Sequence, residues 1–152
     1  MPGEDATDRR PRFLLGHALV LGAAVVFAAG CQEELPTAPN GLVDGITVYN
    51  HAGFSGESAH LTADVSDLSD YKGPCQHTTS SGYSTSYYYD WNDCISSIKV
   101  APGWQATVYV DSGFHEDWLD VVADISDLGQ VRGYCHDDTW NDCISSIRVK
   151  RQ

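Results

Sequence analysis

Two nearly identical stretches of the chain place oxygen-bearing side chains in the same order. Residues 91–100 read WNDCISSIKV, and residues 140–149 repeat them with Arg148 in the place of Lys99. The Asn, Asp and Ser oxygens at the head of each run suit a hard cation such as calcium, which takes about six to eight oxygen ligands. A single copy would be explained as well by an Asn-Asp turn before a strand. Two copies in matching context favour a metal site.

These stretches close the two halves of a longer internal repeat. The strand-like segments 46–49 and 106–109 match at an offset of 60 residues, whereas the closing stretches match at an offset of 49. The first half therefore has eleven extra residues between its first Cys and its Trp. Short strands separated by frequent turn signals predict an all-β, antiparallel sandwich of about eight strands. We expect the domain at 45–152, with the first motif at about 45–101 and the second at about 102–152.

Three local expectations follow from the pattern. Segments 64–68 and 124–128 share the pattern Asp-x-Ser-Asp-Leu, which predicts a turn or single helical turn with Asp64 or Asp124 as its N-cap. Ile95 and Ile98 cannot both face the core of a strictly alternating strand, so we expect a bend or bulge at 96–97. The extra segment 76–90 is polar with four Tyr and is expected to be an exposed loop. The candidate core residues are Ile46, Val48, Tyr49, Phe54, Leu61, Leu68, Ile98, Val100, Val108, Tyr109, Phe114, Val121, Leu128, Ile147 and Val149.

Residues 1–30 have the pattern of an export signal. A basic segment at 9–12 precedes an apolar run at 13–29, which ends in small residues before Cys31. A membrane span is the rival interpretation. The run is short for a span, however, and no basic stop-transfer cluster follows it.

The junction at 28–31, with the sequence AAGC, resembles the lipobox of bacterial lipoproteins. This resemblance implies that Cys31 is lipidated and that the protein is anchored in the outer membrane. An ordinary cleaved signal, leaving a secreted or periplasmic protein, is the alternative. Residues 31–44 contain Pro and Gly without a periodic pattern, which predicts a tether.

Four cysteines remain if Cys31 is lipidated, and an even number in an exported chain indicates two disulfides. Three pairings are possible, and the repeat distinguishes them. Cys75 and Cys135 occupy equivalent positions, as do Cys94 and Cys143, so the symmetric pairs Cys75–Cys94 and Cys135–Cys143 are expected. A four-Cys zinc site is the alternative, but no Cys-x-x-Cys spacing supports it.

The charge balance narrows the function classes. A formal net charge of −12 argues against binding to nucleic acids or anionic membranes. Contact with a membrane is therefore expected only through a lipid on Cys31. No nucleophile–base pair, phosphate loop or paired-carboxylate constellation stands out, so no enzymatic activity is predicted.

Together these residues resemble a βγ-crystallin domain. The hairpin pattern Tyr-x-x-x-x-Phe-x-Gly at 49–56, and the Asn-Asp doublets at 92–93 and 141–142 with their Ser pairs, carry the resemblance. It covers residues 45–150 and implies a sandwich of two Greek-key motifs with two calcium sites, each built by both motifs. One departure is Glu116, which stands in the place of Gly56, where the family uses a positive φ.

The resemblance also implies which oxygens bind calcium. Ser97 and Ser146 are expected not to bind it but to hydrogen-bond the folded hairpins. Disulfides at the cysteines of the two ligand loops would preorganise them for binding. The implied ligands are the carbonyls of Asn92 and Asn141, the carboxylates of Asp93 and Asp142, the hydroxyls of Ser96 and Ser145, and hairpin carbonyls near Ala52 and Ser112.

The expected function is calcium binding by a calcium-stabilised module of a cell-envelope or secreted protein. Two alternatives stay open. An interaction protein such as a protease inhibitor, a role that some proteins of this fold have, would use the Tyr-rich segment 76–90 to bind a protein partner. A structural domain held together by its disulfides would bind no metal appreciably.

Overall fold

The computed structural model describes residues 33–36 and 44–152. The predicted export signal, Cys31 and most of the predicted tether lie outside these residues. The described part consists of strands and short 3-10 helices, without an α-helix. Its strands are β1 (Glu33–Glu34), β2 (Ile46–His51), β3 (Ser55–Leu61), β4 (Tyr71–Ser81), β5 (Ser84–Asp90), β6 (Ser97–Val100), β7 (Trp104–Asp111), β8 (His115–Val121) and β9 (Ser146–Arg151). Its 3-10 helices are η1 (Leu68–Asp70), η2 (Leu128–Gln130) and η3 (His136–Asp138).

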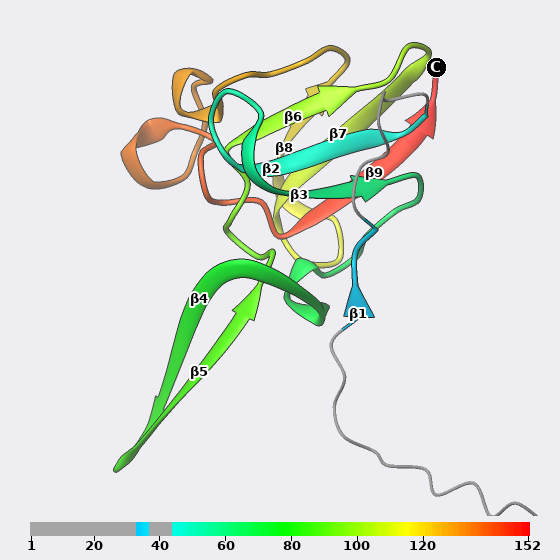
Figure 1. The fold of residues 1–152 in the computed structure, drawn as a ribbon. Helices are drawn as coiled ribbons and strands as arrows, with labels where there is room; N and C mark the ends of the chain where they lie inside the picture. The colour runs from blue at the N-terminus through cyan, green and yellow to red at the C-terminus, as the bar shows by residue number, and fades with distance from the viewer. Residues whose placement is uncertain (1–32, 37–43) are drawn as a thin grey trace, which may run out of the picture. The chain divides into compact units, whose positions relative to one another are not determined.

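Two three-stranded antiparallel sheets form the sandwich, one from each motif (Figure 1). The first has the strand order β3-β2-β6 and the second the order β8-β7-β9. Their registers are equivalent, because Val48 lies opposite Ala59 and Val108 lies opposite Leu119. Apolar side chains at alternate positions of each sheet face the other sheet. The predicted all-β sandwich of two motifs is confirmed.

Each motif adds a short bridge to the sheet of the other. Val65, which follows β3, exchanges two backbone hydrogen bonds with Ile147 in β9, with N···O distances of 2.8 and 2.9 Å. Ile125, which follows β8, does the same with Ile98 in β6, again at 2.8 and 2.9 Å. The segment after the second strand of each motif therefore crosses to the other sheet, which gives the Greek-key connection. Neither sheet is complete without the other motif.

The core lies between the sheets and draws on both motifs. Ile95 and Ile98 are both fully buried, because Ile95 lies before β6 begins at Ser97 and is not subject to the alternation of that strand. The pairing of β6 with β2 is regular from Ser97 onward, without the expected bulge. Other core residues that the pattern did not include are Trp91, Trp140 and Ile144. The candidates that prove to be only half-buried are Tyr49, Phe54, Val100, Tyr109 and Phe114.

The strand period explains why these aromatic candidates lie outside the core. Val48 faces the core with no exposed surface, so Tyr49, the next residue of β2, faces outward. There it packs edge-to-face on Phe54, with ring centroids 5.9 Å apart. The same pair in the second hairpin lies 5.7 Å apart. Each aromatic pair therefore packs within its own hairpin and does not fill the core between the sheets.

The prediction that Asp64 and Asp124 are N-caps was wrong. The cap of η1 is Asp67, whose carboxylate accepts the backbone N–H of Ser69 at 2.9 Å, and η2 is capped in the same way. Asp64 instead accepts the backbone N–H of Val149 at 2.8 Å, in the sheet of the other motif. Its counterpart in the second motif does likewise in β6. Two Asp residues near one turn compete for the cap, and their tertiary partners decide between them.

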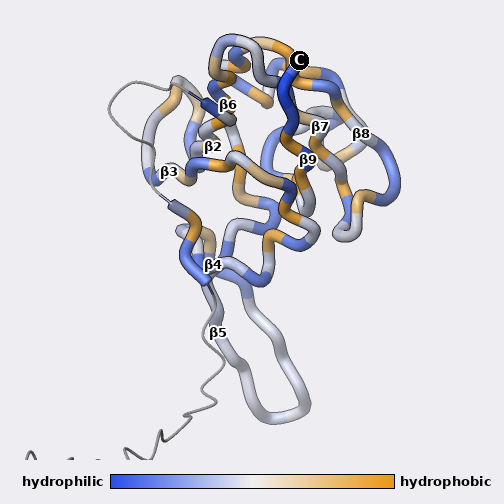
Figure 2. Tube along the Cα trace, turned by 90° about the vertical axis from the view of Figure 1, so that its right-hand side faces the viewer, coloured by the Kyte–Doolittle hydropathy of each residue, from blue (hydrophilic) through white to orange (hydrophobic). Residues whose placement is uncertain are grey.

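The segment expected to be a loop is a two-stranded hairpin. β4 and β5 pair in antiparallel fashion from Cys75 opposite Asp90 to Ser81 opposite Ser84. The turn begins at Gly82 with φ of 60°, as a two-residue hairpin turn requires. Thr and Tyr favour strands, a signal that the polar composition concealed. Figures 1 and 2 show the hairpin extending away from the two sheets, with an intermediate hydropathy along its length.

Part of the predicted tether contacts the domain. β1 pairs in parallel with the start of β4. The Glu34 carboxylate forms an exposed ion pair with Lys72 at 2.9 Å, and the Pro36 carbonyl accepts the backbone N–H of His60 at 2.5 Å. Among the described residues, no helix has the length and apolar character needed to cross a membrane.

Candidate metal centre

The two predicted ligand loops lie side by side and pair with each other. The N–H of Asp93 donates to the carbonyl of Ile144, and the N–H of Asp142 donates to that of Ile95, both at 3.1 Å. Asp93 and Asp142 adopt left-handed φ values of 49° and 52°. Asp tolerates this conformation better than most residues, because its short side chain can hydrogen-bond locally. Each loop therefore turns at its Asp, next to the other motif.

Three oxygens converge at the first crossing between the motifs. The hydroxyl of Ser96 lies 3.0 Å from Oδ1 of Asp142 and 3.1 Å from the carbonyl oxygen of Asn50. We call these three residues the Ser96 cluster. A hydroxyl has one hydrogen to donate, so it satisfies only one of the two acceptors at a time. The remaining contact brings two oxygens together without a hydrogen between them, an arrangement that a cation stabilises.

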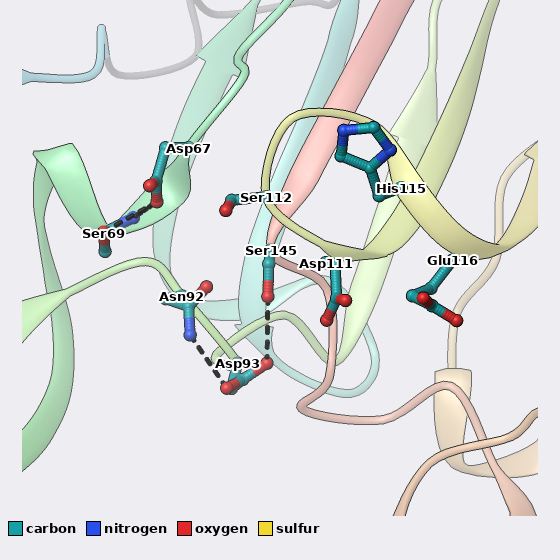
Figure 3. A pocket seen from close by; sticks show the side chains of 9 residues that line it. All are labelled: Asp67, Ser69, Asn92, Asp93, Asp111, Ser112, His115, Glu116 and Ser145. Carbon is teal, nitrogen blue, oxygen red and sulfur yellow. Dashed lines mark hydrogen bonds between the residues drawn. The ribbon is translucent and has the colours of Figure 1, made fainter.

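The second crossing repeats the hydroxyl–carboxylate contact of the first at a longer distance. The hydroxyl of Ser145 lies 3.5 Å from Oδ1 of Asp93, and we call this pair the Ser145 cluster. The other carboxylate oxygen of Asp93 accepts from the side-chain amide of Asn92 at 2.8 Å. Asn141 holds Asp142 in the same way at 2.7 Å. Each Asn therefore orients a carboxylate whose second oxygen reaches across to the other motif, as Figure 3 shows for Asp93.

An open cleft of about 650 Å³ contains the Ser145 cluster (Figure 3). Ser112, which was predicted to offer a carbonyl, lines this cleft together with Asn92. In the first hairpin, the carbonyl of Ala52 accepts the hydroxyl of Ser55 at 2.8 Å. The hairpin carbonyl that reaches Ser96 is that of Asn50, two residues earlier, which no side-chain pattern indicated.

Ser97 and Ser146 hold the hairpins, as predicted. The hydroxyl of Ser97 donates to the carbonyl of His51 at 2.7 Å and accepts the N–H of Phe54 at 3.1 Å. Ser146 makes the same two contacts in the second hairpin, at 2.6 and 3.0 Å. In each case, one acceptor and one donor use the hydroxyl, in contrast with the crowded acceptors of the Ser96 cluster.

The second hairpin keeps its geometry around Glu116. This residue has φ of 61°, close to the 82° of Gly56 at the equivalent position. The strand pairing on either side of the turn is the same in both hairpins. A left-handed conformation costs a residue with a side chain about 1–2 kcal/mol, so the fold imposes this backbone on Glu116.

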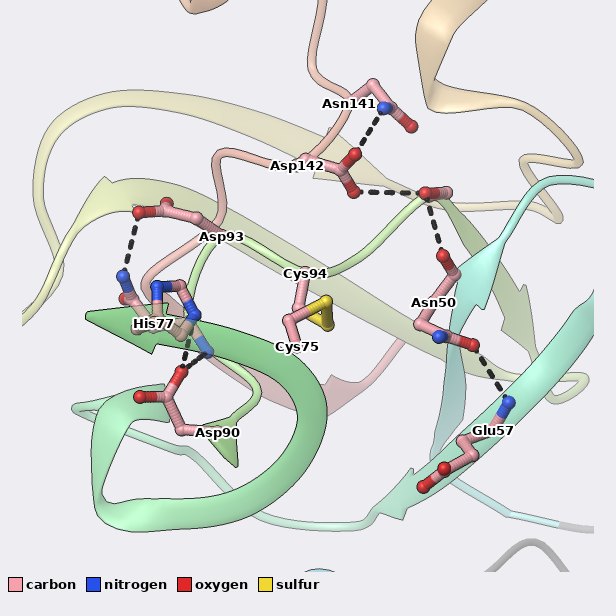
Figure 4. The surroundings of a disulfide bond; sticks show 11 residues. Asn50, Glu57, Cys75, His77, Asp90, Asp93, Cys94, Asn141 and Asp142 are labelled. Atoms are coloured by element: carbon pink, nitrogen blue, oxygen red, sulfur yellow. Dashed lines mark hydrogen bonds and ion pairs between the residues drawn. A yellow bond between two sulfur atoms is a disulfide. The ribbon is translucent and has the colours of Figure 1, made fainter. Parts of the chain in front are cut away.

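Both predicted disulfides are present, as Cys75–Cys94 and Cys135–Cys143. Each begins at the residue after the Asp of a ligand loop and joins that loop to an earlier part of its own motif. Figure 4 shows the first disulfide close to Asp93, and Cys75 lies at the base of the β4–β5 hairpin, opposite Asp90. The bond therefore attaches the hairpin to the first ligand loop.

A buried ion pair at the base of the hairpin was not predicted. Asp90 has no exposed surface, and Nε2 of His77 lies 3.0 Å from its Oδ1 (Figure 4). The same oxygen accepts the N–H of Asn92 at 2.9 Å, so Asp90 holds the start of the ligand loop. Burial raises the pKa of Asp90, and the charge of His77 opposes that shift. In the second motif, the N–H of Asn141 donates to the hydroxyl of Thr139 at 3.3 Å. An Asp or Thr two residues before each Asn, both residue types that cap a following turn, is the sequence signal that could have predicted these bonds.

The electrostatics and the donor types fit calcium. Partial burial raises the pKa of Asp93, while the charge of His77 and the hydrogen bond from Ser145 lower it. A nearby cation favours the ionised carboxylate. Within the described part of the chain, no group of three His, Cys, Asp or Glu side chains is placed so that it could hold a metal ion by itself. The clusters instead combine carboxylate and hydroxyl oxygens, joined in the Ser96 cluster by a carbonyl. Calcium favours such an all-oxygen set, whereas structural zinc sites are built mainly from Cys and His.

Comparison with solved structures gives the same architecture. A structure from work on the evolution of the eye-lens βγ-crystallin domain fold is 24% identical with a TM-score of 0.55, and the match covers 77% of this chain and 95% of that one. A βγ-crystallin domain from Flavobacterium johnsoniae is 28% identical with a TM-score of 0.49, covering 72% and 97%. A βγ-crystallin from Ciona intestinalis is 25% identical with a TM-score of 0.48, covering 71% and 99%. No protein-family model and no curated protein sequence matches the chain. With its two crossed Greek-key motifs, the chain has the fold of βγ-crystallin domains.

Proposed function

We propose that this protein is a calcium-binding module whose two sites are the Ser96 cluster and the Ser145 cluster. The observation that carries the proposal is the approach of two acceptor oxygens, from Asp142 and Asn50, to the single hydroxyl of Ser96. Hydrogen bonding leaves one of these contacts without a hydrogen, whereas a divalent cation is coordinated by all three oxygens.

Each proposed site takes its carboxylate from one motif and its hydroxyl from the other. Calcium, when bound, supplies positive charge that offsets part of the repulsion within a chain of net charge −12. Because neither site is complete within one motif, binding favours the packed arrangement of both. The carbonyls of Asn92 and Asn141, and hairpin carbonyls near Ala52 and Ser112, complete the proposed ligand set together with water.

Thermal melting of the chain in chelator and in calcium tests this function. A ligand that binds only the folded state raises its stability, so calcium should raise the Tm. Magnesium should raise it less, because it demands smaller, near-octahedral geometry. The variant carrying both Asp93→Asn and Asp142→Asn keeps the side-chain shapes and should lose the calcium-dependent shift. No shift in the wild type, or an equal shift in the double variant, would overturn the proposal.

The two disulfides point to an oxidising compartment, either extracellular or periplasmic. We propose that segment 1–30 exports the chain and that a lipid on Cys31 anchors it in the outer membrane, on the support of the AAGC sequence at 28–31. Cells fed a labelled fatty acid should label the wild type but not Cys31→Ser. Cleavage of the wild type without labelling would favour the secreted or periplasmic alternative.

A second candidate function uses the β4–β5 hairpin as a protease-inhibitor strand. Tyr83 at its tip is fully exposed, and Tyr87 is 63% exposed. Residues 73–89 contain no Asp, Glu, Lys or Arg, and the first disulfide anchors the hairpin base. An exposed aromatic side chain on an anchored strand suits the hydrophobic S1 pocket of a chymotrypsin-like protease.

Protease assays test this second candidate. The intact chain should inhibit a chymotrypsin-like protease, and Tyr83→Ser with Tyr87→Ser should reduce the inhibition without affecting the calcium-dependent Tm shift. The absence of inhibition by the intact chain at micromolar concentration would count against this candidate and would leave the calcium proposal untouched.

A further inference from the structure

The two proposed calcium sites are flanked by hairpins that differ in charge. An inference about their relative calcium affinities rests on the proposed calcium-binding function. The second hairpin presents Asp111 and Glu116, where the first has His51 and Gly56. Asp111 and Glu116 both line the cleft that contains Asp93 (Figure 3). The Ser145 cluster therefore has two more neighbouring carboxylates from its hairpin than the Ser96 cluster has.

Glu116 occupies its position against the conformational preference of the backbone. It adopts φ of 61°, at a position where the first hairpin has Gly56. In the first hairpin, a Cβ at Gly56 would overlap the side chain of Asn50, whose Oδ1 accepts the N–H of Glu57 at 2.8 Å. The second hairpin has Val110 in the place of Asn50, and its side chain accepts no such bond. The second hairpin thus lacks both a glycine and a local hydrogen bond, and it has a carboxylate at the cleft instead.

We propose that Glu116 makes the Ser145 cluster the higher-affinity of the two calcium sites. Its negative charge joins those of Asp111 and Asp93 around one cleft, where opposite charge attracts a divalent cation over several ångströms. The Ser96 cluster has His51 at the position of Asp111 and should fill second. Backbone strain of the kind found at Glu116 persists where the surrounding structure maintains it, often at binding sites.

Calorimetric titration of the metal-free chain with calcium tests this order. The wild type should show two steps of unequal affinity, with Asp93→Asn removing the tighter step and Asp142→Asn the weaker one. Glu116→Gln keeps the side-chain size and should weaken only the tighter step, by several-fold. Asp117→Asn is the matched control, because it removes the same charge from the next residue, which does not line the cleft, and it should leave both steps unchanged.

Glu116→Gly adds a readout of opposite sign. Glycine accepts the left-handed backbone, so this variant should raise the Tm of the metal-free protein while weakening the tighter calcium step. A residue with only a structural role would not move stability and affinity in opposite directions. Higher ionic strength should shrink the difference in affinity between Glu116→Gln and the wild type, because salt screens exposed charges.

The possible failures are distinguishable. Equal affinities at the two sites, an unchanged tighter step in Glu116→Gln, or an effect confined to the weaker step would overturn the role of Glu116 while calcium binding stands. The absence of any calcium binding by the wild type would overturn the proposed function itself.

Discussion

The hydroxyl of Ser96 in the first motif lies 3.0 Å from Oδ1 of Asp142 in the second. Its mirror image, Ser145 with Asp93, spans 3.5 Å in the opposite direction. The loops that carry these residues also pair through their backbones. The candidate metal centre is therefore part of the interface between the motifs, and each motif contributes a residue to both sites.

Ser96 and Asp142 should be coupled in calcium binding, whereas Ser96 and Asp93 should act independently. Ser96→Ala and Asp142→Asn remove oxygens from the same proposed site, so their effects on calcium affinity should deviate from additivity by about 0.5–3 kcal/mol. Ser96→Ala combined with Asp93→Asn affects two sites, and the effects should add. Calcium titrations of the single and double variants measure both couplings. Additivity in both pairs would contradict the crossing of the two motifs at each site.

Removal of either disulfide should lower stability and weaken calcium binding. The chain-entropy account predicts a loss of about 3 kcal/mol for Cys75–Cys94, whose cysteines are 19 positions apart, and somewhat less for Cys135–Cys143, which are 8 apart. Cys94 directly follows Asp93, so a freed loop must be ordered when calcium binds. Urea denaturation and calcium titration of the two double-Ala variants measure these effects. Unchanged affinity in both variants would show that the disulfides do not preorganise the loops.

The two motifs should not fold separately. Ile147 and Ile98 are fully buried, and each bridges to a segment of the other motif. Replacing either with Ala should cost about 2–5 kcal/mol of unfolding free energy. Replacement of the exposed Lys150 by Ala is the control and should change stability by less than about 0.5 kcal/mol. The isolated fragment 45–101 should give the amide spectrum of an unfolded chain, and dispersed resonances would contradict this dependence.

The metal-free protein should lose stability as pH rises through the ionisation of Asp93. Burial raises the pKa of Asp93 above the value of about 3.9 for an exposed Asp. The folded state then holds this proton more tightly than the unfolded state. Ionisation of Asp93 therefore costs no stability well below about pH 4, costs progressively more as pH rises, and reaches a constant cost above the raised pKa.

Asp93→Asn isolates this contribution, because Asn does not titrate. The stability of the variant relative to the wild type, measured by urea denaturation in metal-free buffer, should increase as pH rises from below 4 and then level off. A stability difference that is the same at every pH would contradict the raised pKa.

Local patterns were sufficient for the architecture and insufficient for several details within it. Alternation in β2 and β7 predicted the strands of the sandwich, because neighbours along the chain set that pattern. The equivalent cysteines of the internal repeat predicted both disulfides. The same alternation places Tyr49 outside the core, because Val48, the residue before it, faces the core. Tyr49 was predicted to be a core residue because only its hydrophobicity was considered. The prediction of a loop at 76–90 was wrong because a polar composition describes an exposed hairpin as well as a loop.

The sequence by itself determined which residue types could bind a cation, since the Asn, Asp and Ser oxygens and their repetition are visible in the chain. Only the tertiary structure decided which of these oxygens meet. Every residue has a backbone carbonyl, so nothing local marks that of Asn50 as the one that reaches Ser96. Likewise, nothing in its own segment directs Glu116 to the cleft of Asp93. Residues far apart in sequence come together through the packing and crossing of whole motifs, a property of the fold and not of any short segment.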